Sequence, residues 1–531
     1  MESENNTPNT IARRVFYKYR FFSPARGHIW LSFPFFIIVA RGFMAPIVLL
    51  DIYWHLRLGQ IIVETLSIPR TDIFSFTAAG KEFIDQSWLA DVLFYFIYKA
   101  GGFALIVFSS GILLSLILLP LFLLCRKTSP QTGPLVFSLI LVAFCLPWNL
   151  RPQVFSSVLF SFFYWLLWSY RSKAGPAIYA LPILMILWVN LHGAFVMGLV
   201  LIAIFLLVEL VELLIGKLRD AERMRRLKML GLILLLCLVA TLANPELHRV
   251  YDYVLTIMNA ASVQKYVTEW QPPVLNTGDG FVMFYLPFFL LTVAFIISKR
   301  RPTLMEIALY LCFGAYGMIS LRNCVWFLIV SAPMLAVHLS SIEWSAMLPK
   351  PALMAIAKRM MRRNEREPIN RIIALAMLLV LIMQSPWVRM KLRDQSLQAA
   401  ETPVGAMDFI ERNGLKGNIF HPQIYGDYLI WRLWPKQKSF FDGRVHLFDE
   451  AFVKEYSKIF YCSDWEGLLA KYDIKYLLLP NDGKDREVTR IIDSARGSGR
   501  WEARYEDKLS ILFEKISDSR GTMNPCGPFS R

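Results

Sequence analysis

The chain has 531 residues, of which 55% are hydrophobic and 14% aromatic, with a mean hydropathy of +0.43 and a formal net charge of +16. Soluble domains contain about 45–50% apolar residues, and the excess here falls in the first 390 residues, which excludes a purely soluble protein. Residues 391–531 hold 22 Lys and Arg against 21 Asp and Glu, so nearly all of the positive charge belongs to the apolar part. There it indicates membrane orientation rather than nucleic-acid binding, and no nucleic-acid partner is expected.

Long apolar runs recur from residue 29 to residue 390 and predict an all-α polytopic membrane domain. About 17–25 apolar residues are needed to cross a bilayer. Residues 1–28 are polar and basic, and the first apolar run is too long for a cleaved signal peptide, so this run is expected to remain as an anchor. The predicted spans lie near residues 29–50, 103–125, 133–149, 153–169, 176–190, 194–216, 229–243, 281–298, 304–320, 324–339 and 371–388.

The connections between these spans alternate between cation-rich and cation-poor. The basic connections are "CRK" (125–127), "YRSK" (170–173), "KLRDAERMRRLK" (217–228), "KRR" (299–301) and "KRMMRRNER" (358–366). Because basic loops stay in the cytoplasm, this pattern places the N-terminus inside. It places the outer loop 51–102 and the C-terminal segment outside.

The composition changes near residue 400, and a small α/β domain is expected over 400–517, followed by a tail at 518–531. "TPVGAMDFIERNG" (402–414) has a helical period, with Pro403 in its first turn and Gly414 as a stop signal. Predicted strands lie at 418–421, 438–442, 474–480 and 509–515, with helical patterns between them. Whether Cys462 pairs with Cys526 stays open.

Polar side chains gather where the outer connections meet the spans. Charged groups at such positions are costly and usually face a cavity or a partner. One cavity at the outer membrane interface is therefore expected to collect them: Asp51, Trp54, His55, Asp85, Gln86, Trp88, Arg151, Asn190, His192, Asn244, Glu246, Glu269, Arg322 and Asn323.

Each of these residues also has a structural interpretation. Asp51 is a good N-cap for a helix over 52–66, and long cationic side chains at span ends can simply reach the headgroups. Tryptophans at such depths are typical of an aromatic belt. The remaining alternatives are packing for His55, a helix–helix link for Asn190 and His192, and an ion pair with an arginine for Glu269.

Several motifs resemble a known family. They are "DIYWHLRLGQIIVETLSIPRTDIFSFTAAGKEFIDQSWLAD", "RPQVFS", "WVNLHGAF", "EWQPP" and "RNCVWF", with "GDYLIWRLWP" and "FFDGRVHLFDE" near the C-terminus. They resemble bacterial polytopic glycosyltransferases of the GT-C superfamily, distant relatives of protein mannosyltransferases and aminoarabinose transferases. The resemblance implies a polyprenyl-phosphate-linked sugar donor in the bacterial cytoplasmic membrane. It also implies transfer to a glycan, protein or lipid acceptor on the outer face.

The expected chemistry assigns roles to the polar set. A carboxylate takes the acceptor's proton, and arginines stabilise the phosphate that leaves. Asp51 is the predicted base, with His55 and Asp85 as further catalytic residues and Arg151 and Arg322 at the phosphate. The predicted substrate-binding residues are Trp54, Gln86, Trp88, Asn190, His192 and Glu269.

The chain departs from the family in its acid motif. GT-C enzymes often carry Asp-x-Asp in the first outer loop, but here Leu49 and Tyr53 stand two positions from Asp51. A divalent cation (Mg²⁺ or Mn²⁺) therefore stays open, with Asp85 or Glu269 as the other acid.

The predicted α/β domain is expected to overhang the cavity and help select the acceptor, with Asp442 and Arg444 as a structural pair at a strand end. The alternatives to an enzyme are a transporter or flippase for a lipid-linked saccharide, and a non-catalytic binding scaffold.

Overall fold

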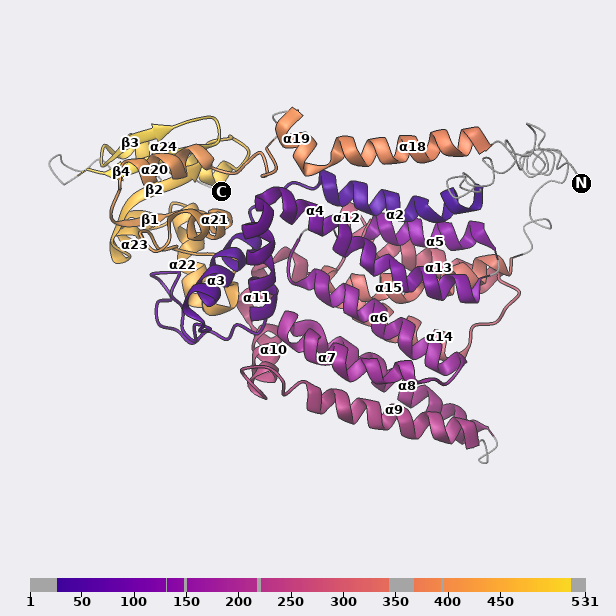
Figure 1. Ribbon diagram of the computed structural model, residues 1–531. Coiled ribbons are helices and arrows are strands. Elements are labelled where there is room, and N and C mark those ends of the chain that lie inside the picture. The colour runs from indigo at the N-terminus through magenta and orange to yellow at the C-terminus, as the bar shows by residue number, and fades with distance from the viewer. Residues whose placement is uncertain are drawn as a thin grey trace, which may run out of the picture.

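The computed structural model describes residues 26–129, 131–147, 150–216, 221–342, 367–392 and 396–516. A bundle of helices forms one half of the molecule, and the C-terminal segment, which carries the sheet, forms the other half (Figure 1). The predicted N-terminal cytoplasmic segment lies almost entirely outside these residues, and the tail at 518–531 and Cys526 lie outside them altogether.

A helix lies at each predicted span. Five stretches are long and apolar enough to cross a membrane: Gly27–Met44, Trp88–Thr128, Gly193–Ile215, Gly278–Ile297 and Leu321–Ser340. The helices of the bundle are α2 (Arg26–Met44), α4 (Trp88–Thr128), α5 (Thr132–Cys145), α6 (Gln153–Ser172), α7 (Ala180–Leu191), α8 (Val196–Ile215), α9 (Ala221–Ala240), α13 (Leu286–Ile297), α14 (Leu304–Ile319), α15 (Cys324–Ser340) and α18 (Glu367–Gln384).

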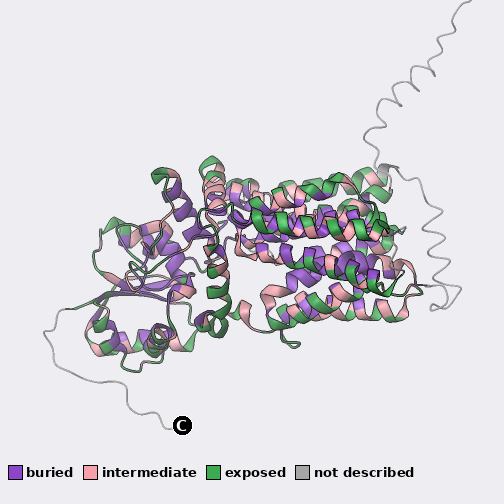
Figure 2. Ribbon diagram, turned by 90° about the horizontal axis from the view of Figure 1, so that it is seen from below, coloured by how far each residue is buried: buried purple, intermediate pink, exposed green. Residues whose placement is uncertain are grey.

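The outward-facing surface of the helix bundle carries many exposed apolar side chains. Leu235, Ile296 and Leu375 are among many large hydrophobic side chains that face outward, and Figure 2 shows exposed residues along the outer helices. Helices satisfy their own backbone hydrogen bonds, so such faces suit lipid. The chain is a multi-pass membrane protein.

The first outer loop folds into helix and packs closely on the bundle. It forms α3 (Ile52–Thr65) and the first part of α4, which is broken at Gly101 and Gly102 (φ +59°). The predicted start of the second span coincides with this break. Gly59 lets α3 approach α4, since a Cβ there would lie 2.1 Å from the Asp91 carbonyl oxygen. Short elements complete the connections: η2 (Pro176–Tyr179), η3 (Gly193–Phe195), α10 (Arg249–Asn259), α11 (Ala261–Tyr266), η4 (Thr268–Trp270), α12 (Gly278–Gly280), η5 (Phe281–Tyr285), η6 (Leu321–Asn323) and α19 (Pro386–Leu392).

The C-terminal segment contains a four-stranded sheet in the order β1-β2-β4-β3, with β1 and β2 parallel and the other neighbours antiparallel. Its strands are β1 (Asn418–Phe420), β2 (Ile474–Pro480), β3 (Trp501–Glu506) and β4 (Ser510–Lys515). Its helices are α20 (Val404–Arg412), α21 (Gln423–Leu433), η7 (Val445–Leu447), α22 (Glu450–Phe460), α23 (Trp465–Lys471) and α24 (Arg486–Ser498).

Three of the four predicted strands are confirmed, and the strand predicted at 438–442 is wrong. Ser439 instead forms a single bridge with Ser75 of the first outer loop. Its N–H donates to the Phe74 carbonyl oxygen at 2.9 Å, and the N–H of Phe76 donates to the Ser439 carbonyl oxygen at 3.1 Å. This segment therefore pairs at one residue with the first outer loop and not with the sheet.

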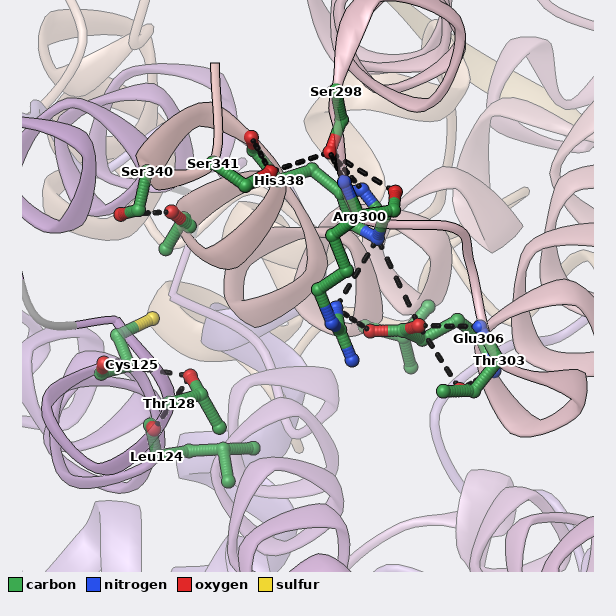
Figure 3. Close-up of polar contacts among 12 residues, drawn as sticks. Leu124, Cys125, Thr128, Ser298, Arg300, Thr303, Glu306, His338, Ser340 and Ser341 are labelled. Atoms are coloured by element: carbon green, nitrogen blue, oxygen red, sulfur yellow. Dashed lines mark hydrogen bonds and ion pairs between the residues drawn. The ribbon is translucent and has the colours of Figure 1, made fainter. Parts of the chain in front are cut away.

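A polar cluster around the buried Glu306 and His338 joins the start of α14 and the end of α15 to the segment that follows α13 (Figure 3). Arg300 donates to Glu306 at 2.8 Å, and the backbone N–H of Thr303 donates to the same carboxylate at 2.7 Å. His338 lies 3.0 Å from the Ser298 hydroxyl. The buried carboxylate of Glu306 is thus paired with Arg300, and these contacts link α14 to the segment that follows α13.

Candidate functional site

A cavity of about 230 Å³ lies between the bundle, the first outer loop and the C-terminal segment. Side chains from α3, α10, η4 and η6 line it, as do residues at the starts of α6 and α8. It brings together ten of the polar residues predicted to share a cavity: Asp51, Trp54, His55, Asp85, Gln86, Arg151, His192, Glu269, Arg322 and Asn323.

Asp51 and Glu269 are held by one guanidinium. Arg151 Nη2 lies 3.0 Å from Asp51 Oδ2, and Arg151 Nη1 pairs with Glu269 Oε1. Asp51 stands at the N-cap position of α3, but its side chain makes no capping hydrogen bond, so the capping interpretation is wrong. Burial alone lowers the pKa of Arg151, but the carboxylates of Asp51 and Glu269 raise it on balance above its ordinary value, so the cation stays charged.

Behind this group lies a second set of buried acids. His55 Nδ1 lies 2.6 Å from Asp91 Oδ1, and both side chains are almost fully buried. Burial lowers the pKa of His55 to about 4, although the carboxylates of Asp51 and Asp85 oppose this shift. Burial, with the nearby Asp91, raises the pKa of Asp85 well above its ordinary value. Burial thus disfavours the charged forms of both His55 and Asp85, which line the cavity.

Arg322 presents an uncommitted positive charge to the cavity. In the part of the chain that the structure describes, no carboxylate lies within ion-pair distance of it. Its Nη2 donates to His192 Nε2 at 3.2 Å, and its guanidinium carbon lies 5.4 Å from the centre of the Trp270 ring. Burial and the charge of Arg322 hold the pKa of His192 well below its ordinary value. A neutral His192 can thus accept the Arg322 hydrogen bond.

The remaining predicted residues serve the fold instead of lining the cavity. Trp88 Nε1 donates to Asn190 Oδ1 at 2.8 Å, and Asn190 Nδ2 donates to the Ala243 carbonyl oxygen at 2.8 Å. Asn244 donates to the same Asn190 oxygen at 3.2 Å, while Glu246 pairs with neighbouring arginines. This network favours the helix-linking interpretation of Asn190.

The C-terminal segment forms one wall of the cavity, through Gly443, Arg444, Val445 and His446. The Gly443 N–H donates to Asp427 Oδ1 at 2.8 Å. A Cβ on Gly443 would lie 2.6 Å from Asp51 Oδ1 and 2.7 Å from Asp427 Oδ2, so the two acids flank this glycine closely. Burial and the charge of Asp51 raise the pKa of Asp427 well above its ordinary value.

Arg444 fastens this wall to the first outer loop. It is 1% exposed and donates to Asp442 at 2.9 and 2.7 Å and to Asp72 at 2.6 Å. The predicted Asp442–Arg444 pair is confirmed, although it follows no strand and extends to Asp72.

Sequence reasoning missed Asp91, Asp427, Gly443 and His446 as parts of this site. Their motifs are visible in "FIDQSWLAD", "GDYL" and "FFDGRVH", but their proximity depends on contacts between distant segments.

The cavity does not offer an ordinary site for a divalent cation. Among the described residues, no group of three or more His, Cys, Asp or Glu is arranged to hold a metal ion. Mg²⁺ takes oxygen ligands in near-octahedral geometry at about 2.1 Å. Asp51 and Glu269 both line the cavity, but each carboxylate is bound to Arg151 instead.

No protein-family model and no curated protein sequence matches the chain. Among solved structures, it is similar to the oligosaccharyltransferase AglB from Archaeoglobus fulgidus, in complex with an inhibitory peptide and a dolichol-phosphate. That match has a TM-score of 0.54 and 14% identity, over 88% of this chain and 70% of that one. An apo form of the Archaeoglobus fulgidus oligosaccharyltransferase gives a TM-score of 0.53 at the same identity and coverage. ArnT from Cupriavidus metallidurans, bound to undecaprenyl phosphate, aligns over 93% of this chain and 98% of that one, with a TM-score of 0.45 and 13% identity. The chain has the fold of the archaeal oligosaccharyltransferase, in agreement with the GT-C fold expected from the sequence motifs.

Proposed function

We propose that the chain is an integral-membrane glycosyltransferase that transfers a sugar from a polyprenyl-phosphate donor to an acceptor at the outer face of the membrane. One observation carries the proposal. A carboxylate, Asp51, and an uncommitted guanidinium, Arg322, line the same cavity at the end of the bundle. Transfer needs a proton acceptor for the incoming hydroxyl or amide and a cation for the departing phosphate.

The two groups divide the reaction between them. Asp51 takes the acceptor's proton while the bond between the sugar and the phosphate breaks. Arg322 donates hydrogen bonds to the phosphate oxygens, where charge develops. Arg151, also predicted at the phosphate, is neutralised by two carboxylates and is assigned to holding Asp51. His55 and Asp85, whose charged forms are disfavoured by burial, are assigned to hydrogen bonds with the sugar, together with Trp54 and Gln86.

The apolar part of the cavity suits the donor's lipid chain. This side is lined by apolar side chains from the start of α8 and from α10: Val196, Met197, Val254, Ile257 and Met258. A polyprenyl chain cannot leave the bilayer, so it must enter sideways. The start of α8 and α10 are the proposed route.

The topology follows the sequence pattern. We assign eleven spans in a bacterial cytoplasmic membrane, the N-terminus inside, and residues 400–517 outside as a domain that helps select the acceptor.

The position of the cavity also bears on the alternatives. Carriers usually hold their substrate near the middle of the bilayer, whereas this cavity lies at one end of the bundle, against the C-terminal segment. A scaffold would bind the lipid-linked sugar without turning it over.

The test replaces Asp51 by Asn in the cell that makes the protein. We expect loss of a surface glycan and accumulation of the lipid-linked sugar. The matched control is Asp252→Asn, at an exposed position of α10 that does not line the cavity. Normal glycans in D51N cells would contradict the assigned role. Turnover of a polyprenyl-phosphate sugar by the purified protein would exclude the scaffold.

A further inference from the structure

We infer that the guanidinium of Arg151 is the resident cation of this site, held between Asp51 and Glu269 where two carboxylates would otherwise bind a divalent ion. The site then works without a metal. The conclusion that catalysis needs no metal rests on the proposed function, but the two ion pairs of Arg151 do not depend on it.

Three segments of the chain meet at this site, two of which carry an acid and one of which carries the guanidinium. Asp51 precedes α3, Glu269 lies in η4, and Arg151 lies two residues before α6. The two acids use different nitrogens, Nη2 for Asp51 and Nη1 for Glu269. This arrangement matches the planar fork of arginine, which bridges two anions through separate donors.

The spacing set by the guanidinium differs from that required by a metal ion. Arg151 Nη2 lies 3.0 Å from Asp51 Oδ2, whereas Mg²⁺ binds its oxygens at about 2.1 Å. Both carboxylates would have to move inward after Arg151 had left. The Arg151 side chain is only 15% exposed, and its neighbour Pro152 also lines the cavity, so the arginine has little room to withdraw.

The charges around the site also favour a single resident cation. Two carboxylates and one guanidinium carry a net charge of −1, and the third acid nearby, Asp427, is buried and hydrogen-bonded to Gly443. A divalent ion beside Arg151 would meet a like charge at close range. The first outer loop also lacks the second acid of an Asp-x-Asp motif, since Tyr53 occupies that position. The sequence departure and the ion pairs thus point to the same conclusion.

The test measures Mn²⁺ binding to the full-length protein in lipid nanodiscs. Electron paramagnetic resonance detects the bound ion, and thermal unfolding detects its effect on stability. We expect wild-type protein to bind no Mn²⁺ in the cavity up to about 1 mM, a concentration typical of weak cation sites. Arg151→Ala leaves two unpaired acids and is expected to bind one Mn²⁺ at least tenfold more tightly, with a rise in melting temperature on Mn²⁺ addition. The double variant R151A/E269Q is expected to lose this binding. Arg151→Lys, which keeps the positive charge, is the matched control and is expected to exclude Mn²⁺.

Two results would overturn the inference. One is stoichiometric Mn²⁺ binding by the wild type that D51N abolishes. The other is an R151A variant, folded by its melting curve, that binds Mn²⁺ no better than the wild type. These measurements need no sugar transfer. A protein that behaves as expected toward Mn²⁺ but turns over no polyprenyl-phosphate sugar would therefore refute only the proposed function. If the inference and the proposed function are both correct, EDTA should leave the transfer rate unchanged.

Discussion

Replacement of Arg322 by Gln is expected to weaken the binding of a polyprenyl phosphate about 10- to 100-fold. A hydrogen bond to a charged group contributes about 1.5–3 kcal/mol, and each 1.4 kcal/mol changes an affinity about tenfold. Stability should change little. Arg322 pairs with no carboxylate in the described residues, and its contacts are a hydrogen bond to His192 and the face of Trp270. No buried anion is left behind, so we expect the free energy of unfolding to change by no more than about 1 kcal/mol.

The assay titrates nanodisc-embedded protein with a short-chain polyprenyl phosphate and follows binding by native mass spectrometry. Arg322→Lys keeps the charge without the planar fork, and we expect it to bind with intermediate affinity. Arg249→Gln is the control, because the Arg249 side chain is 36% exposed, pairs with Glu82 and Glu246, and does not line the cavity. Wild-type affinity in R322Q would refute the assignment of Arg322 to the phosphate. Loss of binding that appears only together with a large fall in melting temperature would refute it as well.

Three further predictions concern the C-terminal segment. Arg444→Met should destabilise the protein by about 3–5 kcal/mol in chemical unfolding, because it leaves two buried carboxylates without their partner; an unchanged unfolding midpoint would contradict the role of Arg444 in joining this segment to the first outer loop. Burial lowers the pKa of His421 to about 4, and its Nε2 accepts from the Phe440 N–H at 3.0 Å. The resulting stability is present above pH 6.5 and should fall by about 3 kcal/mol between pH 6.5 and 4, a loss that must be smaller in His421→Gln. Gly443→Ala, which places a Cβ 2.6 Å from Asp51 Oδ1, should reduce sugar transfer more than it lowers the melting temperature; an unaffected rate would show that this contact does not position Asp51.

The apolar runs of the sequence predicted the helices of the bundle because span length follows from bilayer thickness. Their ends were less predictable. The first span was expected to reach residue 50, but α2 ends at Met44. Ile47 then exchanges hydrogen bonds with Leu397 and Ala399 at 2.7 and 2.9 Å. An apolar stretch can be a helix or an extended segment, and here the choice depends on a partner about 350 residues away.

The residues of the site were also predictable in part: the sequence indicated which residues meet, but not how they pair. Asp51, Arg151, Glu269 and Arg322 were predictable, because charged residues at the ends of apolar runs are costly unless they meet. The pattern could not show that Arg151 pairs with both acids while Arg322 pairs with neither in the described residues. That difference changes the roles of two arginines that looked equivalent in the sequence, and it is visible only in the distances.

The contacts around Arg444 make the C-terminal segment part of the site. Arg444 joins Asp442 of this segment to Asp72 of the first outer loop, and the backbone of Ser439 pairs with Ser75 beside it. The same stretch places Gly443 against Asp51. Any motion that separated the segment from the loop would leave the buried carboxylate of Asp72 without Arg444 and would move one wall of the cavity. Under the proposed function, the acceptor therefore enters a cavity whose walls are already joined, and the C-terminal segment is proposed to select it by the shape of this opening.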